Sequence, residues 1–153
     1  MFESMRSRDV LLPTLLAAGI LLITMGTRQS IGLYVGPMNT TTGLGIATIS
    51  FALAISQFVW GAIQPLAGAA ADKYGPRPVL MAGLLVLALG MAMTPFMTSG
   101  LGLTFAIGLI TAAGAGASSF SVLIGAAAQK LPASARGTAS GIINAGGSLG
   151  QFV

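Results

Sequence analysis

The sequence predicts an all-α integral membrane protein built as a bundle of spanning helices. Of its 153 residues, 54% are hydrophobic and only 7% are charged, against about 25% charged in an ordinary soluble domain. Glycine occupies 22 positions, and small residues of this kind let membrane helices pack closely. Three stretches of chain, between Asp9 and Arg28, Arg28 and Asp72, and Arg77 and Lys130, carry no charge. Together these observations exclude a soluble globular domain.

Turn signals divide the uncharged stretches into four apolar segments, and a fifth follows Arg136; each of the five is expected to be a helix. A loop is expected over 36–43, which holds glycine, proline, asparagine and threonine, and a short turn over 94–100. A spanning helix needs about 20 apolar residues, and the remaining segments are of about that length. The helices are expected at about 10–35, 47–71, 79–96, 101–129 and 137–153, the fifth being incomplete at Val153.

The basic residues alternate between the two ends of these segments and predict an orientation. Six of them flank the segments on one side: Arg6, Arg8, Lys73, Arg77, Lys130 and Arg136. The two loops on the other side contain no Lys or Arg. By the positive-inside rule, the amino terminus and the loops 72–78 and 130–136 are expected to be cytoplasmic. A cleaved signal peptide is the alternative for the first segment, although 10–35 is longer than such peptides require.

Several functional classes are excluded by composition. There is no Cys and no His, so disulfides, thiol nucleophiles, zinc sites, haem ligation through His and a Ser-His-Asp triad are unavailable. The net charge of +4 is too dispersed for nucleic-acid binding. No acidic residue falls within the five segments, so a proton-coupling carboxylate is not expected in this chain. We therefore expect no cofactor, no metal and no enzymatic activity.

The stretch 64–78 carries the motif G-x-x-x-D-K-x-G-x-R. Gly68, Asp72, Lys73, Gly75 and Arg77 occupy its defined positions. Gly68 would allow close approach of another helix, and Gly75 permits the positive φ of a tight turn. Asp72 is expected just past a helix end, where it could pair with Arg77 or face the positive end of another helix. Either contact would act as a latch, whereas Lys73 and Arg77 could instead merely anchor the loop at the lipid headgroups.

This motif resembles the signature between the second and third helices of the major facilitator superfamily. The resemblance implies the first four transmembrane helices and part of the fifth of an amino-terminal six-helix half, with the rest of the transporter absent and the amino terminus cytoplasmic. It also implies that the latch holds the two halves closed on the cytoplasmic side. The chain departs from the family pattern at Pro78, where a second basic residue is common, and lacks both the Arg of the fourth helix and the G-P-x-x-G-G signature of the fifth.

Arg28 is the one charged residue expected inside a membrane segment, about two turns before Val35. An intramembrane Arg costs about 2.5–3.5 kcal/mol on insertion scales, so Arg28 is expected to face a water-filled cavity or a partner. Its fork of donors suits a carboxylate. The alternative is that the side chain snorkels to the outer interface. Polar neighbours such as Tyr34 favour a cavity-facing Arg28 over a snorkelling one. The longer motif Q-P-x-x-G-x-x-x-D-K-x-G-P-R and the position of Arg28 in the first helix together resemble most the monocarboxylate and oxalate/formate transporter branch of the superfamily.

Polar residues at helical spacing mark other faces. Gln57 and Asn144, large amides near mid-helix, are expected to line the same path, while Trp60 could face either the cavity or lipid. The other polar and small positions are interpreted as packing faces. These are Ser50, Gln64 and Gly68 in the second segment, Thr111, Ser118, Gly125 and Gln129 in the fourth, and Gly137, Gly141, Ala145, Ser148 and Gln151 in the fifth.

These expectations predict that the chain belongs to a secondary active transporter of a small solute that works by alternating access. The substrate class that they favour is an organic anion such as a monocarboxylate. The expected substrate-binding residues are Arg28, Tyr34, Gln57, Trp60 and Asn144. The expected partners are a small-molecule substrate, the lipid bilayer and the missing carboxy-terminal half, with no nucleic acid. The expected location is the cell membrane, and a bacterial inner membrane is the favoured one. Two alternatives remain: an efflux protein for neutral or hydrophobic compounds, and a small non-transporting membrane interaction protein.

Overall fold

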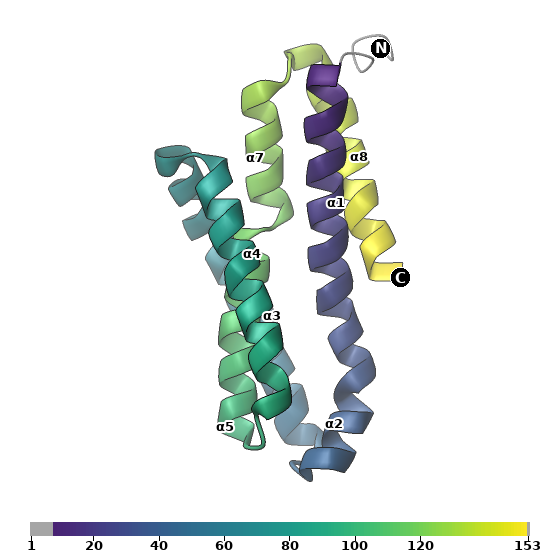
Figure 1. Cartoon of the computed structure of the whole chain (residues 1–153), viewed down its shortest axis with the longest axis vertical. Helices are drawn as coiled ribbons and strands as arrows, with labels where there is room; N and C mark the ends of the chain where they lie inside the picture. The colour runs from purple at the N-terminus through teal and green to yellow at the C-terminus, as the bar shows by residue number, and fades with distance from the viewer. Residues whose placement is uncertain (1–7, 153) are drawn as a thin grey trace.

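A computed structural model describes residues 8–152, which form helices joined by short turns, with no strand among them (Figure 1). The helices are α1 (Arg8–Ser30), η2 (Ile31–Tyr34), α2 (Val35–Thr42), α3 (Ile46–Tyr74), α4 (Pro76–Met93), η3 (Thr94–Phe96), α5 (Gly100–Leu103), η4 (Thr104–Thr111), α6 (Ala112–Ala117), α7 (Phe120–Lys130) and α8 (Ala133–Phe152). Of these, η2 and η3 are 3₁₀-helical and η4 is π-helical. The all-α prediction is confirmed.

Four stretches are long and apolar enough to cross a membrane. They are Val10–Thr42, Ile46–Tyr74, Pro76–Phe96 and Gly100–Ala127. The first four predicted segments are therefore confirmed as helical and apolar. The fifth, α8, is a helix of 20 residues that is less apolar than the other four, because glycine, serine and amide side chains occupy much of it.

The helices form two groups joined by α7 (Figure 1). In one group α1 and α8 lie side by side, and in the other α3 and α4 pack against the stretch from η4 to α6. The start of α1, the α3–α4 turn and the α7–α8 turn lie at one end of the molecule, and α2 lies at the other (Figure 1). The three predicted basic segments thus meet at one end. Arg6 and Val153, and the side chains of Arg8 and Lys130, lie outside the described residues.

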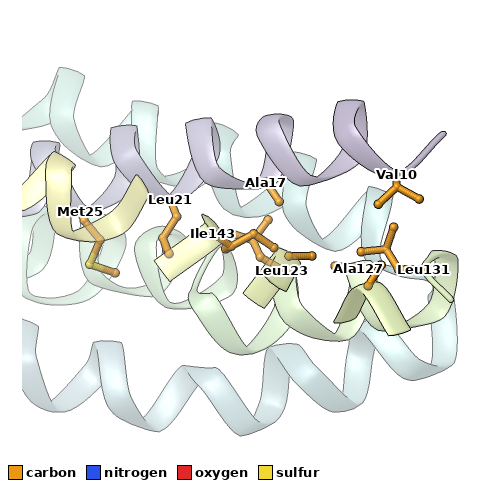
Figure 2. Close-up of a cluster of buried hydrophobic side chains, with 10 residues drawn as sticks. Val10, Ala17, Leu21, Met25, Leu123, Ala127, Leu131 and Ile143 are labelled. Atoms are coloured by element: carbon orange, nitrogen blue, oxygen red, sulfur yellow. The ribbon is translucent and has the colours of Figure 1, made fainter. Parts of the chain in front are cut away.

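The largest buried cluster lies where α1, α7 and α8 meet (Figure 2). Leu21 of α1, Leu123 of α7 and Ile143 of α8 are almost fully buried in it. Glycine allows α8 to approach α1, because a Cβ atom at Gly146 would lie only 2.9 Å from the Cβ of Ala18. The small residues that make this contact are therefore not the predicted ones, since nothing lies within 4 Å of a Cβ at Gly137 or Gly141.

The predicted loop over 36–43 is wrong, because the chain remains helical to Thr42 and turns only over 43–45. Pro37 is tolerated since it falls in the first turn of α2, where a missing N–H costs little. Threonine hydroxyls then bond to the backbone within the helix, as Thr41 Oγ1 does to the Pro37 carbonyl at 2.9 Å. Gly43, with φ +65°, ends the helix. Polar residues here belong to the helix end rather than to a loop.

The predicted single helix over 101–129 is also wrong in detail, because the span breaks between α6 and α7. Ser118 and Ser119 leave the helical conformation, with ψ angles of 24° and 169°. Upstream, η4 is wound as a π-helix in which Thr111 Oγ1 donates to the Ala106 carbonyl five residues earlier, at 2.8 Å. Two irregularities in one membrane span are typical of functional regions of transporters, where discontinuous helices line binding sites.

Candidate functional site

Arg28 of α1 lies over the ring of Trp60 in α3, with its Cζ atom 4.4 Å from the ring centroid. This is the geometry of a cation–π interaction. Trp60 lies at the middle of α3, equally far from Ile46 and Tyr74. The helix that carries Arg28 continues past Val35 to Thr42, so about 20 Å of helix separates Arg28 from its end at Thr42. That distance exceeds the two turns assumed from the sequence, and snorkelling to the outer interface is correspondingly harder.

No carboxylate of the described chain neutralises Arg28. The acidic residue on the facing helix is Asp72, which lies about three turns, or about 18 Å, from Trp60 along α3. Within residues 8–152 the guanidinium makes no hydrogen bond, and its Nε atom is buried without a partner. Trp60 Nε1 is likewise buried and unpartnered. Burying such donors without acceptors is unfavourable, so the site suits an anion that would approach the terminal nitrogens of Arg28.

The backbone of α6 holds Trp60 in place. A Cβ atom at Gly116 would lie 2.8 Å from the carbonyl oxygen of Trp60 and 2.9 Å from Ile63 Cγ2. Only a glycine leaves room for α3 at this position, since these distances are shorter than ordinary van der Waals contact. Gly116 therefore sets how closely α3 packs on α6, and with it the position of the Trp60 ring beneath Arg28.

One turn further along α3, Gln64 reaches across to α7. Ser121 Oγ donates a hydrogen bond to Gln64 Oε1 at 3.1 Å, and the pair is exposed. Ser121 stands in the first turn of α7, immediately after the break at Ser118 and Ser119. Arg28, Trp60, Gln64 and Ser121 thus form a polar strip that runs from α1 across α3 to α7. We call these four residues the Arg28 strip.

The remaining predicted binding residues are not in contact with Arg28. Gln57 is exposed on α3, one turn before Trp60, so it extends the same face. Asn144 is exposed on α8, whereas its neighbour Ile143 faces α1 and is fully buried. Tyr34 is 58% exposed and lies in η2, beyond Arg28. The structure therefore joins Arg28 and Trp60 and leaves the contributions of Gln57, Asn144 and Tyr34 as predictions.

Tyr34 lines a separate pocket of about 570 Å³ between η2, α2 and the facing ends of α4 and η4. Ile31, Met38 and Met91 are among its apolar walls. Its serine and threonine hydroxyls bond to backbone carbonyls of their own helices, as Thr94 Oγ1 does to Gly90 at 2.8 Å. The pocket consequently presents mostly apolar surface.

The turn of the motif lies at the opposite end of the molecule, between α3 and α4. Gly75 has φ +88°, as predicted, and is the single residue between the two helices. Asp72 does not follow the helix end but stands in the last turn of α3, where a negative charge opposes the helix dipole. Asp72 and Arg77 are both exposed and, within the described part of the chain, form no ion pair with each other. The first of the two predicted latch contacts is thus not made.

Asp72 instead opens onto a groove of about 200 Å³ between α3 and α7. Gly68 lines this groove with Ser121 and Gln129, and nothing lies within 4 Å of a Cβ at Gly68. The nearby Lys73 places its Nζ atom 5.0 Å from the ring centroid of Tyr74. The carboxylate and the open glycine therefore share one concave face, which remains available to another helix.

Sequence reasoning missed three features of the site. Ser121 carried no signal, because its role depends on a partner in a distant segment. Gly116 belongs to an Ala-Gly run to which the sequence analysis assigned no role. The break at Ser118 and Ser119 was signalled by two adjacent serines, which disfavour helix interiors. Among the residues that the structure describes, no group of three His, Cys, Asp or Glu comes together to hold a metal ion.

Comparison with known proteins places these features in a family. The family described as the Major Facilitator Superfamily matches residues 16–153. The chain is 33% identical over 139 residues to the oxalate:formate antiporter of Oxalobacter formigenes, a match covering 88% of this chain and 32% of that protein. It is 40% identical over 65 residues to monocarboxylate transporter 13 of Rattus norvegicus, covering 42% of this chain and 14% of that protein. The chain thus spans about a third of the first relative, and both are named for transport rather than catalysis.

Proposed function

The chain belongs to the major facilitator superfamily, and on that premise we propose that it provides one wall of the substrate path in a secondary transporter for a small organic anion. Membership of this family makes it a multi-pass membrane protein that acts on a small molecule. The proposal concerns the finer points: the anionic substrate, the role of Arg28 and the movement that carries the substrate across.

The pairing of Arg28 with Trp60 supports the anionic substrate. The guanidinium lies near the middle of its span, stacked on an aromatic ring and without a carboxylate partner among the described residues. A buried cation without a counter-ion is strongly unfavourable, and a carboxylate substrate would supply the missing charge. Binding near the midplane is also what alternating access requires. Gln57, Asn144 and Tyr34 would extend the path from this point.

A second half would complete the path and close it. We propose that the described helices are part of an amino-terminal six-helix half and that the basic end faces the cytoplasm, in a bacterial inner membrane. The groove beside Asp72 and Gly68 would receive a helix from the second half, whose positive end would pair with the Asp72 carboxylate. Breaking this contact would let the two halves rock apart on the cytoplasmic side.

Uptake measurements with Arg28 variants test the proposal. The protein is reconstituted into liposomes in the form in which the cell makes it, and uptake of labelled oxalate, formate and pyruvate is followed. Arg28→Gln removes the charge and is expected to lower kcat/KM for carboxylates by about thirtyfold or more, since losing one partner of a buried charge pair costs about 2–5 kcal/mol. Arg28→Lys keeps the charge but not the fork, so we expect partial activity.

The matched control is Gln29→Ala, which changes an exposed neighbour on α1 and is expected to leave uptake unchanged. If Arg28→Gln takes up carboxylates as fast as the unmodified protein, the assigned role of Arg28 is wrong. If no carboxylate is taken up by the unmodified protein, the proposal of an organic anion is wrong.

Transport of neutral or hydrophobic compounds is the second candidate, and the apolar pocket at the outer end favours it. At about 570 Å³ the pocket is large enough for a small organic molecule, and its walls offer few free polar groups. Uptake of neutral compounds that is unaffected by Arg28→Gln would favour this candidate over the first.

A further inference from the structure

We propose that Gln64, held in orientation by Ser121, is a second recognition point of the Arg28 site and selects carboxylates that carry a neutral acceptor oxygen beside the carboxylate. The chemical class is that of 2-oxo monocarboxylates. This inference rests on the proposed function, because it assigns a specificity-determining residue to the same site.

The hydrogen bond between Gln64 and Ser121 fixes which way the amide points. Ser121 Oγ donates to Gln64 Oε1 at 3.1 Å, so the acceptor end of the amide is already engaged. The Nε2 group is left as the free end, and it makes no hydrogen bond within residues 8–152 and is not enclosed. A free amide donor exposed to lipid would be unfavourable, so Gln64 Nε2 requires a polar partner. The structure therefore presents a donor, and not an acceptor, to whatever enters.

Gln64 lies one helical turn from the residue on which Arg28 is stacked. Trp60 and Gln64 occupy successive turns of one face of α3, about 6 Å apart along the axis. Arg28 is stacked on the nearer residue, with its Cζ 4.4 Å from the ring centroid. A small molecule lying along the indole ring would meet the Arg28 donors at one end and the Gln64 amide at the other. A planar, two-ended acceptor fits this arrangement.

The start of α7 adds to the attraction for acceptor atoms. Ser119 precedes the helix without capping it, and its Oγ atom is fully buried and unpartnered. The first N–H groups of an α-helix have no acceptors within the helix, and they carry partial positive charge. Ser121 stands in this first turn, so the helix end lies beside Gln64.

The charge balance selects a monoanion with a neutral second oxygen. Within the described residues, the strip offers one full positive charge, at Arg28, and neutral donors, among them the Gln64 amide and Trp60 Nε1. A carboxylate matches the guanidinium, since charged donors bind charged acceptors best. A ketone oxygen matches the amide, because a neutral pair avoids burying a second, uncompensated charge.

Pyruvate and propionate are a matched pair of probes, because they have the same carbon chain and differ at the 2-oxo group. Apparent affinities for both are measured from uptake into liposomes that hold the protein as the cell makes it. The unmodified protein is expected to prefer pyruvate. Gln64→Met keeps the length of the side chain but removes the donor, and we expect it to weaken pyruvate about five- to tenfold while leaving propionate unchanged.

Variants of Ser121 test the orienting role independently and cover the case in which Gln64→Met fails to fold. Ser121→Ala releases the amide, and we expect part of the pyruvate preference to be lost. Ser121→Thr, unlike Ser121→Ala, keeps a hydroxyl and is expected to keep the preference for pyruvate. Gln29→Met removes an exposed amide of α1 and serves as the control, with no change expected.

Three results would overturn the inference. Equal losses for pyruvate and propionate in Gln64→Met would show a structural role rather than recognition of the 2-oxo oxygen. An unchanged preference for pyruvate over propionate in both Gln64→Met and Ser121→Ala would show that these residues do not belong to the site. If Arg28→Gln nevertheless lost carboxylate uptake, the proposed function would stand without this inference. Absence of all carboxylate uptake by the unmodified protein would overturn both proposals.

Discussion

The Arg28 guanidinium lies over the indole ring of Trp60, 4.4 Å from its centroid, and so links two helices at mid-height of the bundle. Hydrophobic packing alone does not require this contact, since the ring could be covered by an aliphatic side chain. A stacked guanidinium keeps its in-plane donors available for a second partner. The ring therefore holds the cation in place without neutralising it.

Loss of the Trp60 ring should weaken anion binding. Trp60→Leu removes the cation–π contact, and we expect the KM for a carboxylate to rise about tenfold, the equivalent of about 1.4 kcal/mol. Trp60→Phe retains an aromatic face, so its effect should be smaller. Phe58→Leu is the matched control, because Phe58 is 74% exposed on the same helix. Equal KM values for Trp60→Leu and the control would contradict a role for the ring.

A methyl group should be tolerated at one glycine of α8 and not at another. Gly146→Ala introduces a Cβ atom 2.9 Å from that of Ala18, and we expect the free energy of unfolding to fall by about 1–3 kcal/mol. At Gly141 nothing lies within 4 Å, so Gly141→Ala should be neutral or stabilising by up to about 1 kcal/mol. Thermal unfolding in detergent measures both, and similar midpoints would refute the α1–α8 packing described above.

Gly75 should resist substitution because of its backbone conformation. Its φ of +88° is strained for any residue with a Cβ atom, so Gly75→Ala is expected to destabilise the protein by about 1–2 kcal/mol. Gly36→Ala, at an exposed helical position of α2, is the control and should leave the unfolding midpoint nearly unchanged. If the two variants unfold alike, the α3–α4 turn does not have the conformation described.

Neutralising Asp72 should open the groove between α3 and α7. The chain has no cysteine, so Ala126→Cys, which lines the groove, supplies a single labelling site within it. In the proposed latch, Asp72 pairs with a helix of the second half that covers the groove. We therefore expect Asp72→Asn to raise the rate of maleimide labelling there about tenfold, since a lost charge-assisted contact is worth about 1.5 kcal/mol. Asp72→Glu keeps the charge and should label slowly. Labelling that is equally fast in all three backgrounds would argue against a latch.

Much of the fold could be predicted from local signals. The charge-free stretches located the four apolar spans, because a charged side chain inside a bilayer is costly wherever the chain later folds. The positive φ at Gly75 was predictable because glycine adopts it without steric cost, although the expected loop over 72–78 is a one-residue turn in the structure. The end of α2 was not predictable, because Pro37 and the following threonines are compatible with either a helix end or a loop.

Which residues come together in the site could be learned only from the tertiary structure. The sequence by itself determined that Arg28 sits within an apolar span and needs a partner, because an Arg side chain within such a span is costly in any fold. Only the packing of α1, α3 and α7 decided that this partner is the Trp60 ring and that Ser121 orients Gln64, because these contacts join residues far apart in the chain. Hydropathy specifies which segments enter the membrane, and side-chain geometry between helices specifies what they hold there.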